Sequence, residues 1–172
     1  MFSRFKAKIK REGVFTMRVS DDPFTLWSIS GCIGVAIRDL YDLVMAFFQH
    51  GHGKNMIWNI AADIFLKPAE IHSVWGNVLG LLADLVIGGI LGAIIGLTIK
   101  LTGPKNYWLK GWAIGLVAWL LFFGVLLHNL PHIEKTAPED AIANILAFIG
   151  HSIFGLITAW VYIRLAKSAA RE

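Results

Sequence analysis

The chemistry available to this sequence rests on ionisable residues that lie inside long apolar stretches. Arg38, Asp84 and His151 each fall near the middle of a stretch long enough to cross a bilayer, for which about 20 mostly apolar residues suffice. A charge at that depth costs a few kcal/mol on insertion scales, so it needs a partner. We therefore predict that Arg38 pairs with Asp84 and that His151 lies close to both.

Asp39 and Asp42 follow Arg38 closely and extend this buried polar cluster outward. One hypothesis is a proton- or cation-handling protein, because a histidine beside a carboxylate can exchange protons near neutral pH. The alternative is a non-transporting structural or assembly subunit of a membrane complex, in which the charges only fix helix packing. Breaking one partner of a buried ion pair costs about 3–5 kcal/mol, which would be enough to retain these residues without transport. The sequence leaves both functions open.

A second polar layer is predicted on the outer side of the cluster. It consists of Asn77, Asn144, His128 and Asn129. Five of the six histidines are also predicted on the outward side, and histidine with carboxylate is ligand chemistry for zinc, iron or copper. The candidates for a divalent metal site are His72, His128 and His132. No tightly spaced motif such as His-Glu-x-x-His supports it, and the cofactor content stays unknown.

Two short motifs resemble catalytic signatures but fail on physical grounds. The run from Gly150 to Gly155 has one residue more than the G-x-S-x-G nucleophile elbow, and it lies in the middle of an apolar stretch. The run from Gly51 to Lys54 lacks the spacing of a phosphate-binding loop. The sequence therefore predicts that the protein is not an enzyme.

Four apolar stretches must position the polar residues, in a chain of 172 residues of which 56% are hydrophobic. They cover residues 24–49, 71–99, 109–130 and 140–164. The predicted fold is all-α, a four-transmembrane-helix bundle formed by residues 23–166. Residues 55–67 are apolar but too short to span, and we expect them to form a short interfacial helix in the first outer loop.

Small residues recur along one side of the second stretch, at Gly80, Gly88, Gly92 and Gly96. Membrane helices approach one another closely along such seams. The seam could serve a second copy of the chain, but we expect it to lie between helices of one chain.

The distribution of positive charge predicts the orientation. Twelve of the 16 Lys and Arg lie in residues 1–20, 100–110 and 164–172, against three in the two opposite loops. By the positive-inside rule both termini are cytoplasmic.

Residues 1–22 form a basic tail or interfacial helix that would meet anionic lipid headgroups, and residues 167–172 form a cytoplasmic tail. The first residues lack the apolar region of a signal peptide, so the first stretch is expected to be an uncleaved anchor. Because the basic charge fits a membrane orientation, we expect no nucleic acid partner. A homo-oligomer or a membrane-protein partner stays open.

The second half of the chain carries a family resemblance. It rests on Lys110-Gly111-Trp112 at the start of a stretch, on residues 119–123 ahead of the Pro131 loop, and on residues 150–155 in the last stretch. These features resemble small bacterial four-span inner-membrane proteins of the YqhR-like kind. The resemblance implies this topology and the bacterial inner (plasma) membrane, and it implies no site residue.

Overall fold

The structure, a computed structural model, describes residues 22–48, 57–126 and 141–169, and the regular secondary structure in these ranges is all helical. Its elements are α2 (Pro23–Phe48), α3 (Ile57–Asp63), α4 (Val74–Thr102), α5 (Tyr107–Trp119), the π-helix η2 (Leu120–Leu126) and α7 (Ala141–Ala169). The predicted all-α fold is confirmed for these residues.

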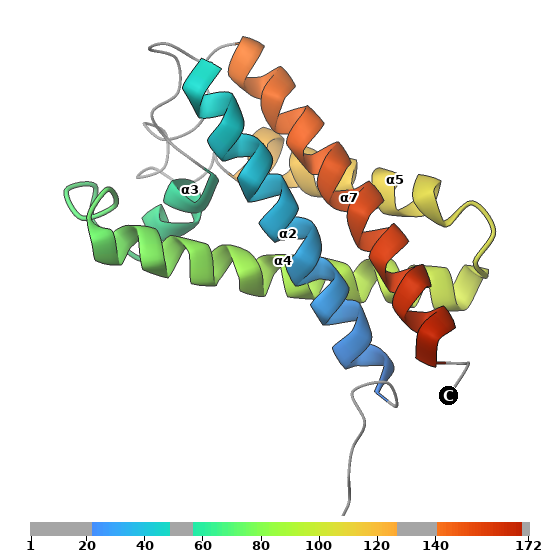
Figure 1. Cartoon of the computed structure of the whole chain (residues 1–172). Coiled ribbons are helices and arrows are strands. Elements are labelled where there is room, and N and C mark those ends of the chain that lie inside the picture. The colour runs from blue at the N-terminus through green and yellow to red at the C-terminus, as the bar shows by residue number, and fades with distance from the viewer. Residues whose placement is uncertain (1–21, 49–56, 127–140, 170–172) are drawn as a thin grey trace, which may run out of the picture.

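The helices are arranged around α2 (Figure 1). On one side α7 packs against α2 and runs in the opposite direction, and on the other side α4 crosses α2 at a steep angle. The short helix α3 packs on the first half of α4, and α5 packs on α7. Side chains from α2, α4 and α7 can therefore meet, although these helices are far apart in the sequence.

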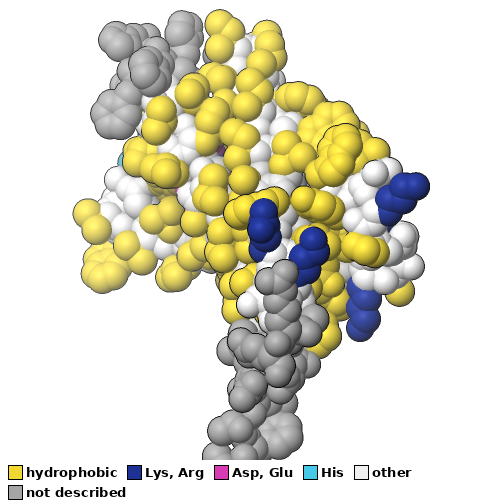
Figure 2. Space-filling view, turned by 45° about the vertical axis from the view of Figure 1, so that its right-hand side comes forward, with side chains coloured by type: hydrophobic (Ala, Val, Ile, Leu, Met, Phe, Trp, Pro, Cys, Tyr) yellow, Lys and Arg dark blue, Asp and Glu magenta, His cyan; other side chains and the backbone are white. Residues whose placement is uncertain are grey.

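Three of the described helices are long and apolar enough to cross a membrane. They are Val74–Thr102, Tyr107–Val125 and Ala141–Ser168. The 26 residues of α2 are less apolar because Arg38, Asp39 and Asp42 lie among them. Hydrophobic side chains cover most of the described part of the face shown in Figure 2. Many large hydrophobic residues are exposed, and Trp75 is the most exposed of them at 80%. Such an apolar exterior is typical of a protein that faces lipid.

The ends of α2 and α4 are capped by local side chains. Asp22 accepts hydrogen bonds from the backbone N–H groups of Phe24 (3.1 Å) and Thr25 (3.2 Å), with Pro23 at the first helical position. Together with a bond from the Thr25 hydroxyl, these contacts hold the pKa of Asp22 below its ordinary value. Just after the C-terminal end of α4, the Lys110 side chain donates a hydrogen bond to the Gly103 carbonyl oxygen over 2.6 Å.

The third apolar stretch differs from the uniform helix expected over residues 109–130. Its α-helix ends at Trp119, and residues 120–126 continue as a π-helix, with backbone bonds from i to i+5. π-helical segments are rare in proteins, and those that occur often lie at functional sites. Phe122 and Phe123 lie in this segment, beside the polar cluster described below.

The expected interfacial helix also differs in detail. The observed helix α3 is seven residues long, and Asn59, Ile60, Ala61, Ala62 and Asp63 are all buried. The helix is therefore buried in the protein, whereas an interfacial helix would contact it along one face only.

The predicted tail at residues 1–22 lies almost entirely outside the described residues, as do residues 127–140.

Glycines mark the points where helices cross. A Cβ atom on Gly92 would lie 2.5 Å from the Gly31 Cα and 2.5 Å from the Trp27 carbonyl oxygen. Gly88 faces Val35 and Gly31, while Gly96 faces the Trp27 ring. Gly88, Gly92 and Gly96 of the predicted seam thus contact α2 of the same chain, and only small residues allow this approach.

Two further glycines complete the packing of the cluster's surroundings. A Cβ atom on Gly80 would meet the Trp58 carbonyl group of α3. On the opposite side of the molecule, a Cβ atom on Gly115 of α5 would lie 2.5 Å from the His151 carbonyl oxygen of α7. The helices that carry Asp84 and His151 are therefore held by direct contact with neighbouring backbone.

Candidate functional site

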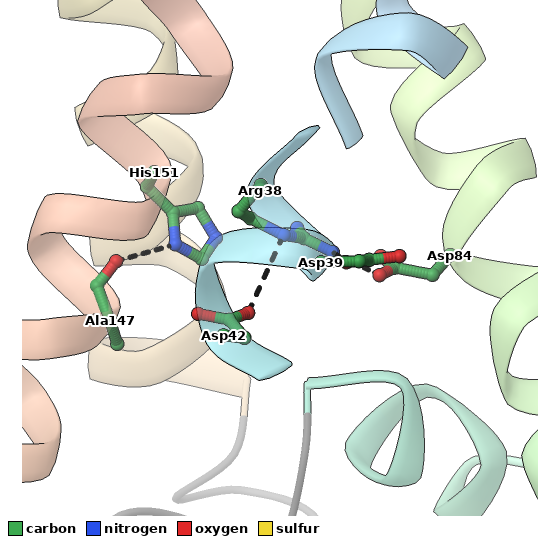
Figure 3. A network of polar contacts seen from close by, with 6 residues as sticks. All are labelled: Arg38, Asp39, Asp42, Asp84, Ala147 and His151. Atoms are coloured by element: carbon green, nitrogen blue, oxygen red, sulfur yellow. Dashed lines mark hydrogen bonds and ion pairs between the residues drawn. The ribbon is translucent and has the colours of Figure 1, made fainter. Parts of the chain in front are cut away.

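The buried polar cluster is formed by three helices (Figure 3). Arg38 comes from α2, Asp84 from α4 and His151 from α7, and they are 4%, 3% and 4% exposed, respectively. Asp39 and Asp42, one turn or less beyond Arg38, complete the group. All five residues that the sequence places in this cluster therefore lie together.

Arg38 is the centre of the cluster. Its Nη2 donates to Asp84 Oδ2 of the neighbouring helix α4 and to Asp39 Oδ1 of its own helix, the latter over 2.7 Å. Its Nε lies 3.9 Å from Asp42 Oδ2, which is an ion-pair distance but too long for a hydrogen bond. Neither of these two atoms has a hydrogen-bond partner within the described part of the chain. The network around the guanidinium group is thus incomplete on the Asp42 side.

The formal charges of the cluster do not balance. Three carboxyl groups surround one guanidinium group, so with every group ionised and His151 neutral the cluster would carry two excess negative charges. Buried charges are stable only when they are paired. Bound protons or a bound cation would supply the missing positive charge.

His151 is held in one orientation by its own helix. Its Nδ1 lies 2.9 Å from the Ala147 carbonyl oxygen, and because a carbonyl only accepts, Nδ1 carries the proton. The ring packs edge-on against Phe123, with 5.4 Å between the ring centres. The other ring nitrogen, Nε2, is turned toward the segment of α2 that carries Arg38 (Figure 3). A proton acceptor therefore faces the charged cluster.

A pocket leads to the cluster from the side of α3, α4 and η2. It encloses a cavity of about 40 Å³. Arg38, Asp84 and His151 are its polar lining residues. Its apolar walls are Ile57, Ile60, Ala61, Ile64, Ile87, Leu91, Phe122 and Phe123. Asp39 and Asp42 do not line it.

The predicted outer layer is only partly placed. Asn77 joins α3 to α4, since its Oδ1 accepts from Trp58 Nε1 and from Asn59 Nδ2, each over 3.0 Å. Asn144 lies near the start of α7. His128, Asn129 and His132 lie outside the described residues. Exposed His72 belongs to no group of three potential metal ligands within the described ranges.

Replacing Asn77 with Leu should loosen α3 from α4. The change removes the acceptor shared by Trp58 and Asn59, and two lost hydrogen bonds of this kind cost about 2 kcal/mol together. Amide hydrogen exchange followed by mass spectrometry should show faster exchange in residues 57–63 and unchanged exchange in residues 141–169. Equal protection of α3 in both proteins would contradict this role for Asn77.

Two buried polar residues of α3 were missed from the sequence. Asn59 and Asp63 are one helical turn apart, and both are buried. Polar residues at this spacing indicate a polar stripe, but in a helix expected at the interface such a stripe is expected to face water.

Comparison with known proteins adds no guidance on this site, because no protein-family model, curated protein or solved structure matches the chain.

Proposed function

We propose that this chain is a four-span membrane protein in which α2 crosses the membrane in addition to the three apolar helices described above. Support comes from the place of α2, which packs between α4 and α7, two helices that are long and apolar enough to span. Its charged residues are turned toward these neighbours, so that lipid would meet its apolar side chains, such as Leu40 and Val44. A helix with charged residues can span when those residues are paired inside the bundle.

The orientation follows from the charged end of the molecule. Lys and Arg side chains gather in one part of the face shown in Figure 2. Five of the seven Lys and Arg in the described residues lie at the end of α4, in the turn after it, at the start of α5 and at the end of α7: Lys100, Lys105, Lys110, Arg164 and Lys167. The other two are Arg38, which is buried in the cluster, and Lys67, which follows α3. By the positive-inside rule this end is cytoplasmic, which leaves α3 in the first outer loop. We further propose a bacterial plasma membrane, which the resemblance to YqhR-like proteins would imply.

We infer that the cluster handles protons or cations, and its charge imbalance is the observation that carries this function. One guanidinium group cannot neutralise three carboxyl groups. The cluster is therefore suited to take up a proton and to release it when another positive charge arrives. His151 Nε2 is the neutral acceptor next to it.

The carboxyl groups differ in their access to solvent, which suggests a direction for this exchange. The side chains of Asp39 and Asp42 are 12% and 13% exposed, against 4% for Asp84. Asp39 and Asp42 also lie closer than Arg38 to the end of α2 that is proposed to face outward. We therefore propose that protons reach the cluster through Asp39 and Asp42, and that Asp84 and His151 form its inner part.

Proton uptake by purified protein in liposomes tests this function. An imposed pH gradient should give a response of an enclosed pH-sensitive dye that is lost when His151 is replaced by Phe, which fills the same space without an acceptor nitrogen. The control is His72→Phe, because His72 is exposed and lies outside the cluster. A response that survives in folded His151→Phe protein, or no response in wild-type protein, would contradict the proposal.

The second candidate is a structural or assembly subunit. The observation in its favour is that every carboxyl group of the cluster lies within ion-pair distance of Arg38, which joins α2 to α4. This function predicts folded protein with no proton response. It also predicts that the ion pair can be exchanged for apolar residues without loss of assembly.

A further inference from the structure

The pocket beside the cluster has the chemistry of a ligand site, since it combines apolar walls with a charged base. We propose that it binds a primary organic ammonium ion with an apolar body, and that this ion takes the place of a proton in the cluster. The inference rests on the proposed function, because it names the cation that the cluster handles.

The walls indicate an organic ligand rather than a hydrated ion. Isoleucine, leucine, alanine and phenylalanine side chains from three helices surround the approach to Asp84. Phe122 and Phe123 are also among the lining residues, and aromatic rings can attract cations. The described residues present no group of three metal ligands at this place. An inorganic cation needs several oxygen ligands, whereas an organic ammonium ion is satisfied by a carboxylate and an apolar surface.

The base of the pocket selects the charge of the ligand. Asp84 and Arg38 line it directly. Asp39 accepts from the same Nη2 atom of Arg38 as Asp84 does, and Asp42 lies on the Nε side of Arg38, so carboxyl groups outnumber the one guanidinium group at this base. An anionic head group would add to the excess of negative charge, while a neutral one would leave it uncorrected. An ammonium group has three donors and no acceptor, so it suits carboxylate oxygens and the Nε2 of His151.

Charge balance couples the ligand to a proton. With two protons bound, the cluster of one guanidinium group and three carboxyl groups is neutral. It is also neutral with one proton and one ammonium ion bound. Binding of R–NH₃⁺ therefore releases one H⁺ to solvent, with no covalent bond formed or broken in the ligand.

Isothermal titration calorimetry with phenethylammonium chloride tests the proposal on detergent-purified full-length protein at pH 7. Titrations in two buffers with different ionisation enthalpies measure the protons released on binding. We expect saturable binding with about one proton released per ammonium ion, and no binding of 2-phenylethanol, which has the same body without the charge. Absence of saturable binding, or equal binding of the alcohol, would overturn the proposal.

Two variants of the same type separate the pocket from the rest of the surface. Ile64 is an exposed residue that lines the pocket, whereas Ile90 is an exposed residue of α4 that does not. Ile64→Trp should weaken binding at least tenfold by narrowing the mouth, and Ile90→Trp should leave it unchanged. Equal effects of the two changes would show that the ion binds elsewhere.

Asp84→Asn tests the base of the pocket. Removing one partner of a buried charge pair should weaken phenethylammonium binding by roughly a hundredfold or more. Since this variant could also unfold, the Ile64→Trp result and the proton release of wild-type protein decide the question independently. A proton response in liposomes without phenethylammonium binding overturns this inference alone. Binding without proton release overturns both the exchange step and the proposed function.

Discussion

Replacing Arg38 with Met should destabilise the folded protein more than any other single change in the cluster. The substitution keeps most of the side-chain length and removes the one cation that the described ranges place in ion-pair contact with the three carboxyl groups of the cluster. Breaking a buried pair in this way costs about 3–5 kcal/mol. For a chain of this size the loss corresponds to a fall in Tm of roughly 10 °C, which thermal unfolding in detergent would measure.

The control for Arg38→Met is the double variant Arg38→Met/Asp84→Leu. It removes the most deeply buried carboxyl group together with its partner and leaves Asp39 and Asp42, which are more exposed. We expect it to recover most of the lost stability, because an apolar pair of similar volume can replace a buried ion pair at little cost. A double variant that is no more stable than Arg38→Met would show that Asp84 is not the main partner of Arg38.

The same double variant separates the two functions. A structural subunit should keep its assembly when the ion pair is exchanged for apolar residues. A proton-handling protein should fold in this form but lose its response to a pH gradient, since the inner carboxyl group is gone. Stability and proton uptake, measured on one preparation, therefore answer different questions.

The meeting of Arg38, Asp84 and His151 could be predicted from the sequence. Each residue lies near the middle of its apolar stretch, and the residues one turn away on the same side are small or polar. Charged residues at similar depths in helices of one bundle are pushed together, because lipid cannot solvate them. Depth and helical spacing together were sufficient, and no long-range information was needed.

The pocket could not be predicted in the same way. It depends on α3 packing into the protein beside α4, and on the π-helix that carries Phe122 and Phe123. A hydrophobic pattern does not distinguish a buried short helix from an interfacial one, because both are apolar. It also does not indicate where i to i+5 bonds replace i to i+4 bonds. The steep crossing of α4 over α2 likewise follows from contact geometry rather than from composition.

That crossing leads to the second large expected effect, which concerns two neighbouring glycines of α4. Gly92→Ala should destabilise the protein by about 3 kcal/mol, the upper part of the usual range for overpacking. Its new methyl group would lie 2.5 Å from backbone atoms of Gly31 and Trp27, and backbone cannot rotate away as a side chain can. Thermal unfolding of the purified variant would measure the loss.

Gly89→Ala is the matched control, since it makes the same change three residues earlier in the same helix. There the nearest atom to the new methyl group would be the Cys32 sulfur at 3.5 Å, which is an ordinary contact. Alanine also stabilises a helix relative to glycine, so this variant should be as stable as wild type or up to about 1 kcal/mol more stable. Opposite signs for the two variants would locate the crossing at Gly92. Equal losses would mean that α4 resists any added methyl group on this side, and that Gly92 has no special contact with α2.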